Sequence, residues 1–218
     1  RVVEKFFWVA DYLVNALKIG LPMAAQSVLM SGAQIVGTMI VAPLGNIAIA
    51  ANTLGITAES LCYMPGYGIG EAATTLIGQS IGAGRRDLCR SFSRMTLYSG
   101  MAVMGAVMFV FAYEMMALMT PVEAICQLGA KCLRIEAFAE PMFAASIVAV
   151  SVCVGAGDTL KPAIISLCSM WFLRLSLAYA LSLHYGLVGV WVAMAVELTV
   201  RGILLSARLF RGKWMAKV

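Results

Sequence analysis

The feature that most constrains this chain is a series of long apolar stretches separated by short polar segments. Each stretch holds about 20 or more mostly apolar residues, the length at which a helix crosses the hydrocarbon core of a bilayer. Hydrophobic residues make up 61% of the sequence and charged residues 12%, whereas a typical soluble domain has about 25% charged residues. These values argue against a soluble domain and predict an all-α integral membrane protein.

Prolines, glycines and charged clusters divide the apolar sequence into six expected membrane crossings. The crossings are expected at residues 19–44, 48–82, 97–119, 124–154, 162–183 and 187–209. Residues 1–18 mix charges with Phe6, Phe7 and Trp8, so we expect an amphipathic connecting segment in the membrane interface. Trp214 is expected to be an interfacial anchor. The sequence therefore predicts a six-helix transmembrane bundle that follows a connecting segment.

The distribution of lysine and arginine predicts the orientation of the bundle. If the six crossings are counted in turn, most basic residues fall on one side: Arg1, Lys5, Lys18, Arg85, Arg86, Arg90, Arg94, Lys161, Arg208, Arg211, Lys213 and Lys217. The other side holds Lys131 and Arg134. Because cytoplasmic loops carry the excess of basic residues, both termini are expected in the cytoplasm. The net charge of +5 is too small and too scattered for a nucleic-acid-binding surface.

Two acids interrupt the second expected crossing, and the first of them is the strongest candidate for a functional site. Glu59 lies well inside the crossing, where a carboxylate costs a few kcal/mol. Tyr63 follows one turn later, within reach of a hydrogen bond, and Pro65 with its neighbouring glycines is expected to break the helix. Glu71 lies roughly 18 Å farther along and is expected at the mouth of the pore. Glu59 is predicted to bind a proton or a cation, and the alternative is a structural contact with a neighbouring helix.

The fourth expected crossing contains a second candidate acid beside a proline. Glu140 directly precedes Pro141, whose missing N–H frees a carbonyl group near Ala137 that can help to bind a cation. The alternative is a structural ion pair between Glu140 and Arg174. The segment 134–136, earlier in the same stretch, is expected to lie in the interface. We therefore name Glu140 as the second candidate for ion or proton coupling.

The remaining polar patterns argue against an enzyme. Glu197 and Arg201 stand four residues apart with the acid first, which favours a structural ion pair within one helix. The six cysteines include no C-x-x-C pair, so we expect no disulfide, no metal site and no cofactor. No H-E-x-x-H or paired aspartate motif is present. Residues 78–82 read G-Q-S-I-G and so match G-x-S-x-G, but they lie within an expected membrane crossing, where Gly78 and Gly82 are interpreted as a close helix-packing face. A purely structural subunit would leave Glu59 and Glu71 unexplained.

Several short motifs, taken in order, resemble a known transporter family. They are AESLCYMPGYGIGEAATTLIGQSIGAG, AEP, GAGDTLKP, RLSLAY, GLVGVWVAM and VRGILL. Their order and spacing are similar to the C-terminal half of bacterial multidrug and toxic compound extrusion (MATE) transporters. The resemblance implies a twelve-helix protein in two six-helix lobes, which exports organic, often cationic, compounds in exchange for entering sodium or protons. This chain would then be one lobe in the bacterial cytoplasmic membrane, with an N-terminal lobe as its partner and membrane lipids around it.

The chain also departs from that family. Some members carry acids near the positions of Met30 and Phe143, where this chain has none, so Glu59 and Glu140 are the available substitutes. The coupling ion, sodium or proton, therefore stays open. We expect the substrate to occupy a cavity lined by methionine and aromatic residues. The alternative function is a flippase for lipid-linked oligosaccharides or polysaccharide precursors, a protein of a related fold.

Overall fold

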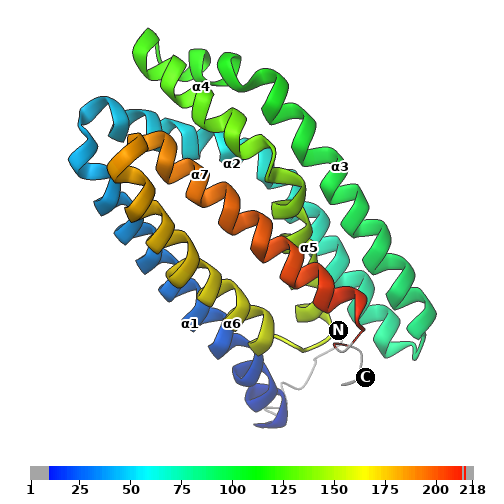
Figure 1. Ribbon diagram of the computed structural model, residues 1–218. Helices are drawn as coiled ribbons and strands as arrows, with labels where there is room; N and C mark the ends of the chain where they lie inside the picture. The colour runs from blue at the N-terminus through cyan, green and yellow to red at the C-terminus, as the bar shows by residue number, and fades with distance from the viewer. Residues whose placement is uncertain (1–9, 213, 215–218) are drawn as a thin grey trace, which may run out of the picture.

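The computed structural model describes residues 10–212 and residue 214, and the regular elements in that part of the chain are all helical (Figure 1). In chain order they are α1 (Ala10–Val41), the 3₁₀ turn η1 (Ala42–Leu44), α2 (Asn46–Gly82), α3 (Arg86–Met119), α4 (Glu123–Ala137), α5 (Glu140–Gly155), α6 (Leu160–Cys168), the π-helical segment η2 (Ser169–Arg174) and α7 (Leu175–Phe210). The predicted all-α class is confirmed for these residues.

The helices pack into one bundle with an alanine-rich core. Helix α5 contacts α2, α3 and α7, and α2 also contacts α3, while α1 and α6 lie side by side at one edge and contact α7 (Figure 1). Alanines 51, 58, 144, 149 and 193 are fully buried between them. Small side chains let helix backbones approach closely, which is the main source of helix association where lipid surrounds the protein.

The C-terminal segment Leu160–Phe210 reverses direction at Gly186. This residue has φ of +57°, a conformation that favours glycine, and Figure 1 shows the chain turning back there. The two arms of the reversal approach closely, because a Cβ atom on Gly189 would collide with the carbonyl oxygen of Leu181. The segment therefore consists of two antiparallel helices.

Helices α4 and α5 form a bent pair. Their axes differ by 59°, and the break falls at Phe138 and Ala139, just before Glu140 and Pro141. Because Pro141 has no N–H, it fits the first turn of α5 and cannot donate to the carbonyl group of Ala137. This bend places Glu136 and Glu140 inside the bundle.

Several helices are suited to a membrane by their length and hydropathy. Within the described ranges, the segments Gly20–Leu44, Asn46–Gly82 and Leu160–Phe210 are long and apolar enough to cross, and the bent pair α4–α5 adds a fourth if it counts as one crossing. Helix α3 contributes the shorter apolar helix Met108–Met119. The starts of α3 and α6 and the end of α7, which carry the basic residues, lie at one end of the bundle (Figure 1). At that end, an ion pair between Arg208 and Asp158 connects α7 to the loop between α5 and α6.

Three sequence-based expectations are wrong. Helix α2 continues without interruption through Pro65, because its neighbours hold it in place and no residue in it leaves helical geometry. Glu136 is fully buried instead of interfacial, since the bend turns it inward. Trp214 is buried too, and its indole N–H donates to the carbonyl oxygen of Leu209 at 2.9 Å. Of the expected connecting segment, residues 1–9 lie outside the described residues, and residues 10–18 belong to α1.

Candidate functional site

A cavity of about 310 Å³ lies between α1, α2, α5, η2 and α7. Helix α2 supplies one wall as a stripe of residues spaced three or four apart. The stripe consists of Asn52, Ile56, Glu59, Tyr63 and Tyr67. This spacing keeps all five side chains on one face of a helix. The wall therefore follows directly from helical periodicity.

Glu59 is the acid that lines this cavity. Its side chain is only 7% exposed, and within the described part of the chain it makes no hydrogen bond and no ion pair. Tyr63 lies on the same wall but does not donate to it. The guanidinium groups of Arg174 and Arg201 also line the cavity and act electrostatically on the carboxylate. Glu59 is thus a buried group that is free to bind a ligand or a proton.

Aromatic rings surround the carboxylate. Tyr63 packs edge-to-face against Tyr67 and Phe143, with ring centroids 5.6 and 5.8 Å apart. The Arg201 guanidinium lies 5.6 Å from the centroid of the Phe143 ring, a cation–π distance. These rings offer flat apolar surfaces beside a negative group, a combination that suits organic cations.

Trp191 on α7 also lines the cavity and is buried. Its indole N–H donates to Oδ1 of Asn52 at 3.1 Å, which joins α7 to α2. The ring lies so close to α2 that a Cβ atom on Gly55 would approach Cζ2 to 2.8 Å. Gly55 therefore allows Trp191 to take its place in the cavity wall.

The two arginines of the cavity differ in their partners. Arg201 and Glu197 form an ion pair, with 3.3 Å between Nε and Oε1, although the geometry is not that of a hydrogen bond. Arg174 ends the π-helical segment η2, and its guanidinium contacts the sulfur of Met194. It forms no ion pair with Glu140 or with any other acid among the described residues. Within the cavity, Glu59 is therefore the acid whose charge balances that of Arg174, although the two form no direct ion pair.

Glu140 lies away from the cavity and is enclosed by protein. Both Glu140 and Glu136 have no exposed surface, and none of their four carboxyl oxygens has a hydrogen-bond partner in the described chain. Phe143, one turn beyond Glu140, lines the cavity, whereas Glu140 does not. A carboxyl group in such surroundings is stable when it is neutral or when a cation lies beside it.

The structure thus brings together some of the candidate residues and separates others. Glu59, Tyr63, Arg174 and Arg201 share the cavity, whereas Pro65 and Glu71 are exposed on the outside of α2. Glu197 is buried behind Arg201. Sequence reasoning missed Asn52, Tyr67 and Trp191 as lining residues. The first two could have been found by extending the helical stripe from Glu59 in both directions.

The positions of the missing family acids also belong to this cavity. Met30 on α1 and Phe143 on α5 both line it. Met170 and Met194 complete a set of flexible, polarisable side chains in the lining. Glu59 therefore faces the same space as the two positions at which the resemblance places acids.

Metal and disulfide chemistry find no support in the described residues. No group of three histidine, cysteine or acidic side chains in them is arranged to hold a metal ion. The six cysteines are free thiols, and all but Cys168 are buried.

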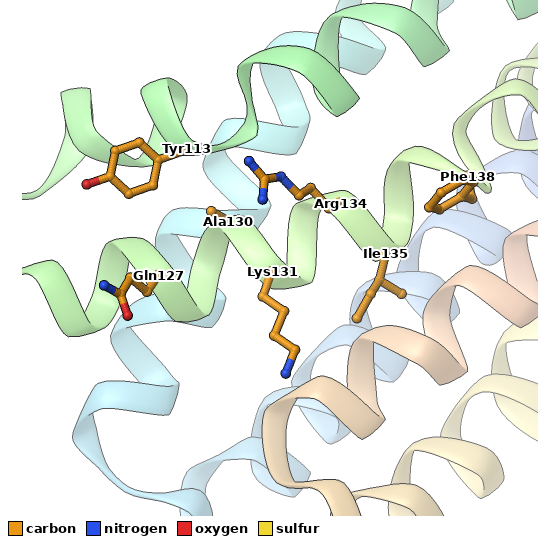
Figure 2. Close-up of a pocket in the computed structure, with 7 residues that line it drawn as sticks. All are labelled: Tyr113, Gln127, Ala130, Lys131, Arg134, Ile135 and Phe138. Carbon is orange, nitrogen blue, oxygen red and sulfur yellow. The ribbon is translucent and has the colours of Figure 1, made fainter.

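A second hollow, of about 540 Å³, lies between α3 and α4 (Figure 2). Its lining residues are Tyr113, Gln127, Ala130, Lys131, Arg134, Ile135 and Phe138. It shares no residue with the cavity around Glu59. We call it the α3–α4 pocket.

Comparison with known sequences places the chain in the MatE family. The sequence model of the MatE family matches residues 22–180. The chain is 27% identical over 203 residues to the "Probable multidrug resistance protein NorM" of Thermotoga maritima, a match that covers 91% of this chain and 44% of that protein. It is 26% identical over 212 residues to the "Uncharacterized transporter YisQ" of Bacillus subtilis, with 95% and 47% covered. The chain spans about half the length of the curated relatives it matches.

Solved structures show the same fold. The Vibrio cholerae MATE transporter VcmN in its bent form superposes with a TM-score of 0.88 at 19% identity, over 100% of this chain and 50% of that one. An inward-facing multidrug resistance MATE family transporter superposes with a TM-score of 0.81 at 20% identity, over 97% and 50% of the two chains. The fold of this chain is therefore that of half a transporter.

Proposed function

This chain belongs to the MatE family, and from that premise we propose that it forms one lobe of an ion-coupled antiporter that exports organic cations across the bacterial cytoplasmic membrane. The other lobe is an N-terminal six-helix bundle, because half a transporter lacks the opposing wall that alternating access requires. The protein transports its substrate without chemical change and so is not an enzyme. Both termini of this lobe face the cytoplasm.

The observation that supports this proposal best is the single buried carboxylate of Glu59 in a cavity with aromatic walls. In its ionised state, Glu59 attracts an organic cation, and the rings of Tyr63, Tyr67 and Phe143 provide apolar and cation–π contacts. The ligand is thus recognised by its charge and by its flat apolar surface.

The neighbouring arginines supply the coupling. When a proton or a sodium ion neutralises Glu59, the charge of Arg174 is no longer balanced within the cavity, and an organic cation is repelled. Entry of the coupling ion therefore weakens substrate binding and favours release. The change of local charge also biases the packing between inward-facing and outward-facing states.

Glu140 is the second coupling acid in this proposal. It lies one turn from Phe143 and is enclosed in the described structure, so it exchanges its proton or ion only when the bend between α4 and α5 moves. The coupling ion stays open between a proton and sodium. Substrate transport measured in everted vesicles, energised by a pH gradient alone or by a sodium gradient alone, distinguishes proton coupling from sodium coupling.

The test is efflux by the complete transporter that carries Glu59→Gln. We expect ion-driven efflux of an organic cation such as ethidium to fall at least about tenfold, because the amide binds no proton or sodium ion in this range. Glu71→Gln is the matched control, since it removes the same charge from the exposed face of the same helix. Efflux that is unchanged by Glu59→Gln, with equal protein in the membrane, removes Glu59 from the mechanism.

The alternative, a flippase for lipid-linked saccharide precursors, needs a wide cavity with several cations for phosphate groups. In the described cavity, Arg201 is paired with Glu197, which leaves Arg174 as the cation without an acidic partner. A gene deletion that blocks pyrophosphoryl-lipid translocation, with no change in drug tolerance, favours this alternative.

A further inference from the structure

The α3–α4 pocket carries positive charge that nothing in the described chain neutralises. Lys131 and Arg134 are both exposed, and neither has a hydrogen-bond or ion-pair partner among the residues that the structure describes. Figure 2 shows the Arg134 side chain reaching toward α3 and Tyr113, while Lys131 extends in another direction from α4. Both side chains are therefore hydrogen-bond donors that are available to an anionic ligand.

One acid beside the pocket is held by two hydrogen bonds. Glu123, at the start of α4, accepts a hydrogen bond from the Tyr113 hydroxyl at 3.1 Å and one from Nε2 of Gln127 at 2.8 Å. Both donors line the pocket, so they hold this carboxylate in place, and it forms no ion pair with Lys131 or Arg134 in the described chain. The two cations outnumber this one acid, so the net charge presented to a ligand is positive.

The other part of the pocket is apolar and continues onto the outside of α3. Phe138 is 77% exposed and packs edge-to-face against Phe109, with 5.4 Å between the ring centroids. Val110 beside Phe109 is exposed as well. The surface thus changes from cationic to apolar along one continuous path, which matches a ligand that has an anionic head and an apolar tail.

We propose that the α3–α4 pocket binds the phosphate group of a membrane phospholipid, with an acyl chain lying along Phe138 and Phe109. Arg134 is the main anchor, because its planar guanidinium donates two parallel hydrogen bonds to a phosphate. Lys131 adds a second positive charge on a flexible side chain. The volume of about 540 Å³ lies within the range of ligand pockets, roughly 300–1,000 Å³.

This site is independent of the transport mechanism, since it shares no residue with the cavity around Glu59. With both termini in the cytoplasm, Lys131 and Arg134 belong to the outer half of the membrane. The bound lipid is therefore one of the outer leaflet. It contacts both α3 and the bent pair α4–α5.

The test is photo-crosslinking of the complete transporter in nanodiscs that contain phosphatidylglycerol with a diazirine in one acyl chain. Peptide mass spectrometry then locates the crosslinks. We expect them on the peptides that contain Phe138 and Phe109. Arg134→Gln should reduce this yield at least tenfold, Lys131→Gln should reduce it less, and Arg94→Gln should leave it unchanged. Arg94 is the matched control because it is an exposed arginine near the other end of α3.

Three results overturn the proposal. The first is an unchanged crosslink yield in Arg134→Gln, which removes the phosphate contact. The second is complete loss of crosslinks when glycerol 3-phosphate is added at a concentration equal to that of the lipid, which makes the ligand a water-soluble phosphate. The third is the absence of crosslinks on both peptides in the unmodified transporter, which means that another part of the protein covers the pocket. Phe138→Ala, a change at an exposed position, should reduce the yield while binding of a soluble phosphate stays the same.

Discussion

Two regions of this molecule combine an acid with a proline at membrane depth, and the structure treats them in opposite ways. In α2, Glu59 lines the cavity and Pro65 lies in an uninterrupted helix. At the α4–α5 break, Glu140 is enclosed and Pro141 belongs to the first turn of a new helix. The same pair of residue types therefore gives an accessible acid in one place and an inaccessible acid in the other.

The difference shows that the two acids are distinguished by their access to the cavity more than by their depth in the membrane. A group that exchanges ions during transport needs a path to water or substrate, and the cavity provides that path for Glu59. Glu140 and its neighbour Glu136 have no such path in this conformation, and their oxygens lack partners. We therefore propose the main coupling role for Glu59, and for Glu140 a role that depends on movement of the bend.

The largest expected effect is on ion-driven efflux by the two glutamine variants. Glu59→Gln should reduce efflux at least about tenfold, whereas Glu140→Gln should reduce it by about twofold to fivefold, because Glu140 is enclosed in this conformation and has the secondary coupling role. Initial rates of ethidium efflux at equal amounts of membrane protein measure both. An equal loss in the two variants would break the distinction between them.

The prolines give the next largest effect, on stability. Pro65→Ala restores a backbone hydrogen bond inside a continuous helix and should raise the free energy of unfolding, by at most about 3 kcal/mol. Pro141→Ala should change it by less than about 1 kcal/mol, because proline is well accommodated in the first helical turn. Thermal unfolding of the purified transporter compares the two. Destabilisation by Pro65→Ala would mean that α2 needs a local distortion at this proline.

The smallest effect concerns the glycines of α2. Gly55→Ala places a Cβ atom against the rigid ring of Trp191 and should destabilise the protein by about 1–3 kcal/mol. Gly68→Ala is the matched control, because nothing lies within 4 Å of the added atom in the described structure. Its better helix propensity should stabilise the protein by up to about 1 kcal/mol. If both variants lose stability equally, the contact with Trp191 is not the cause.

Sequence alone predicted the features that depend on local pattern. The all-α class followed from the apolar runs, and the deep position of Glu59 beside Tyr63 followed from helical spacing.

The features that sequence alone missed depend on tertiary packing. Pro65 was expected to break α2, but neighbouring helices hold the chain helical there. Glu136 was expected in the interface, but the 59° bend turns it into the core. Trp191 lines the cavity because α7 packs against Gly55 and Asn52 of α2, a helix that is far from it in the sequence.

The central claim is that Glu59 binds substrate and coupling ion in turn. The most direct measurement is the affinity of the purified complete transporter for an organic cation such as tetraphenylphosphonium, as a function of pH and of sodium concentration. In the unmodified protein, affinity should fall as the pH falls or as sodium rises, because the coupling ion and the substrate compete for one carboxylate. In Glu59→Gln, affinity should be low and independent of both. A Glu59→Gln variant that keeps the full pH or sodium dependence would contradict the account.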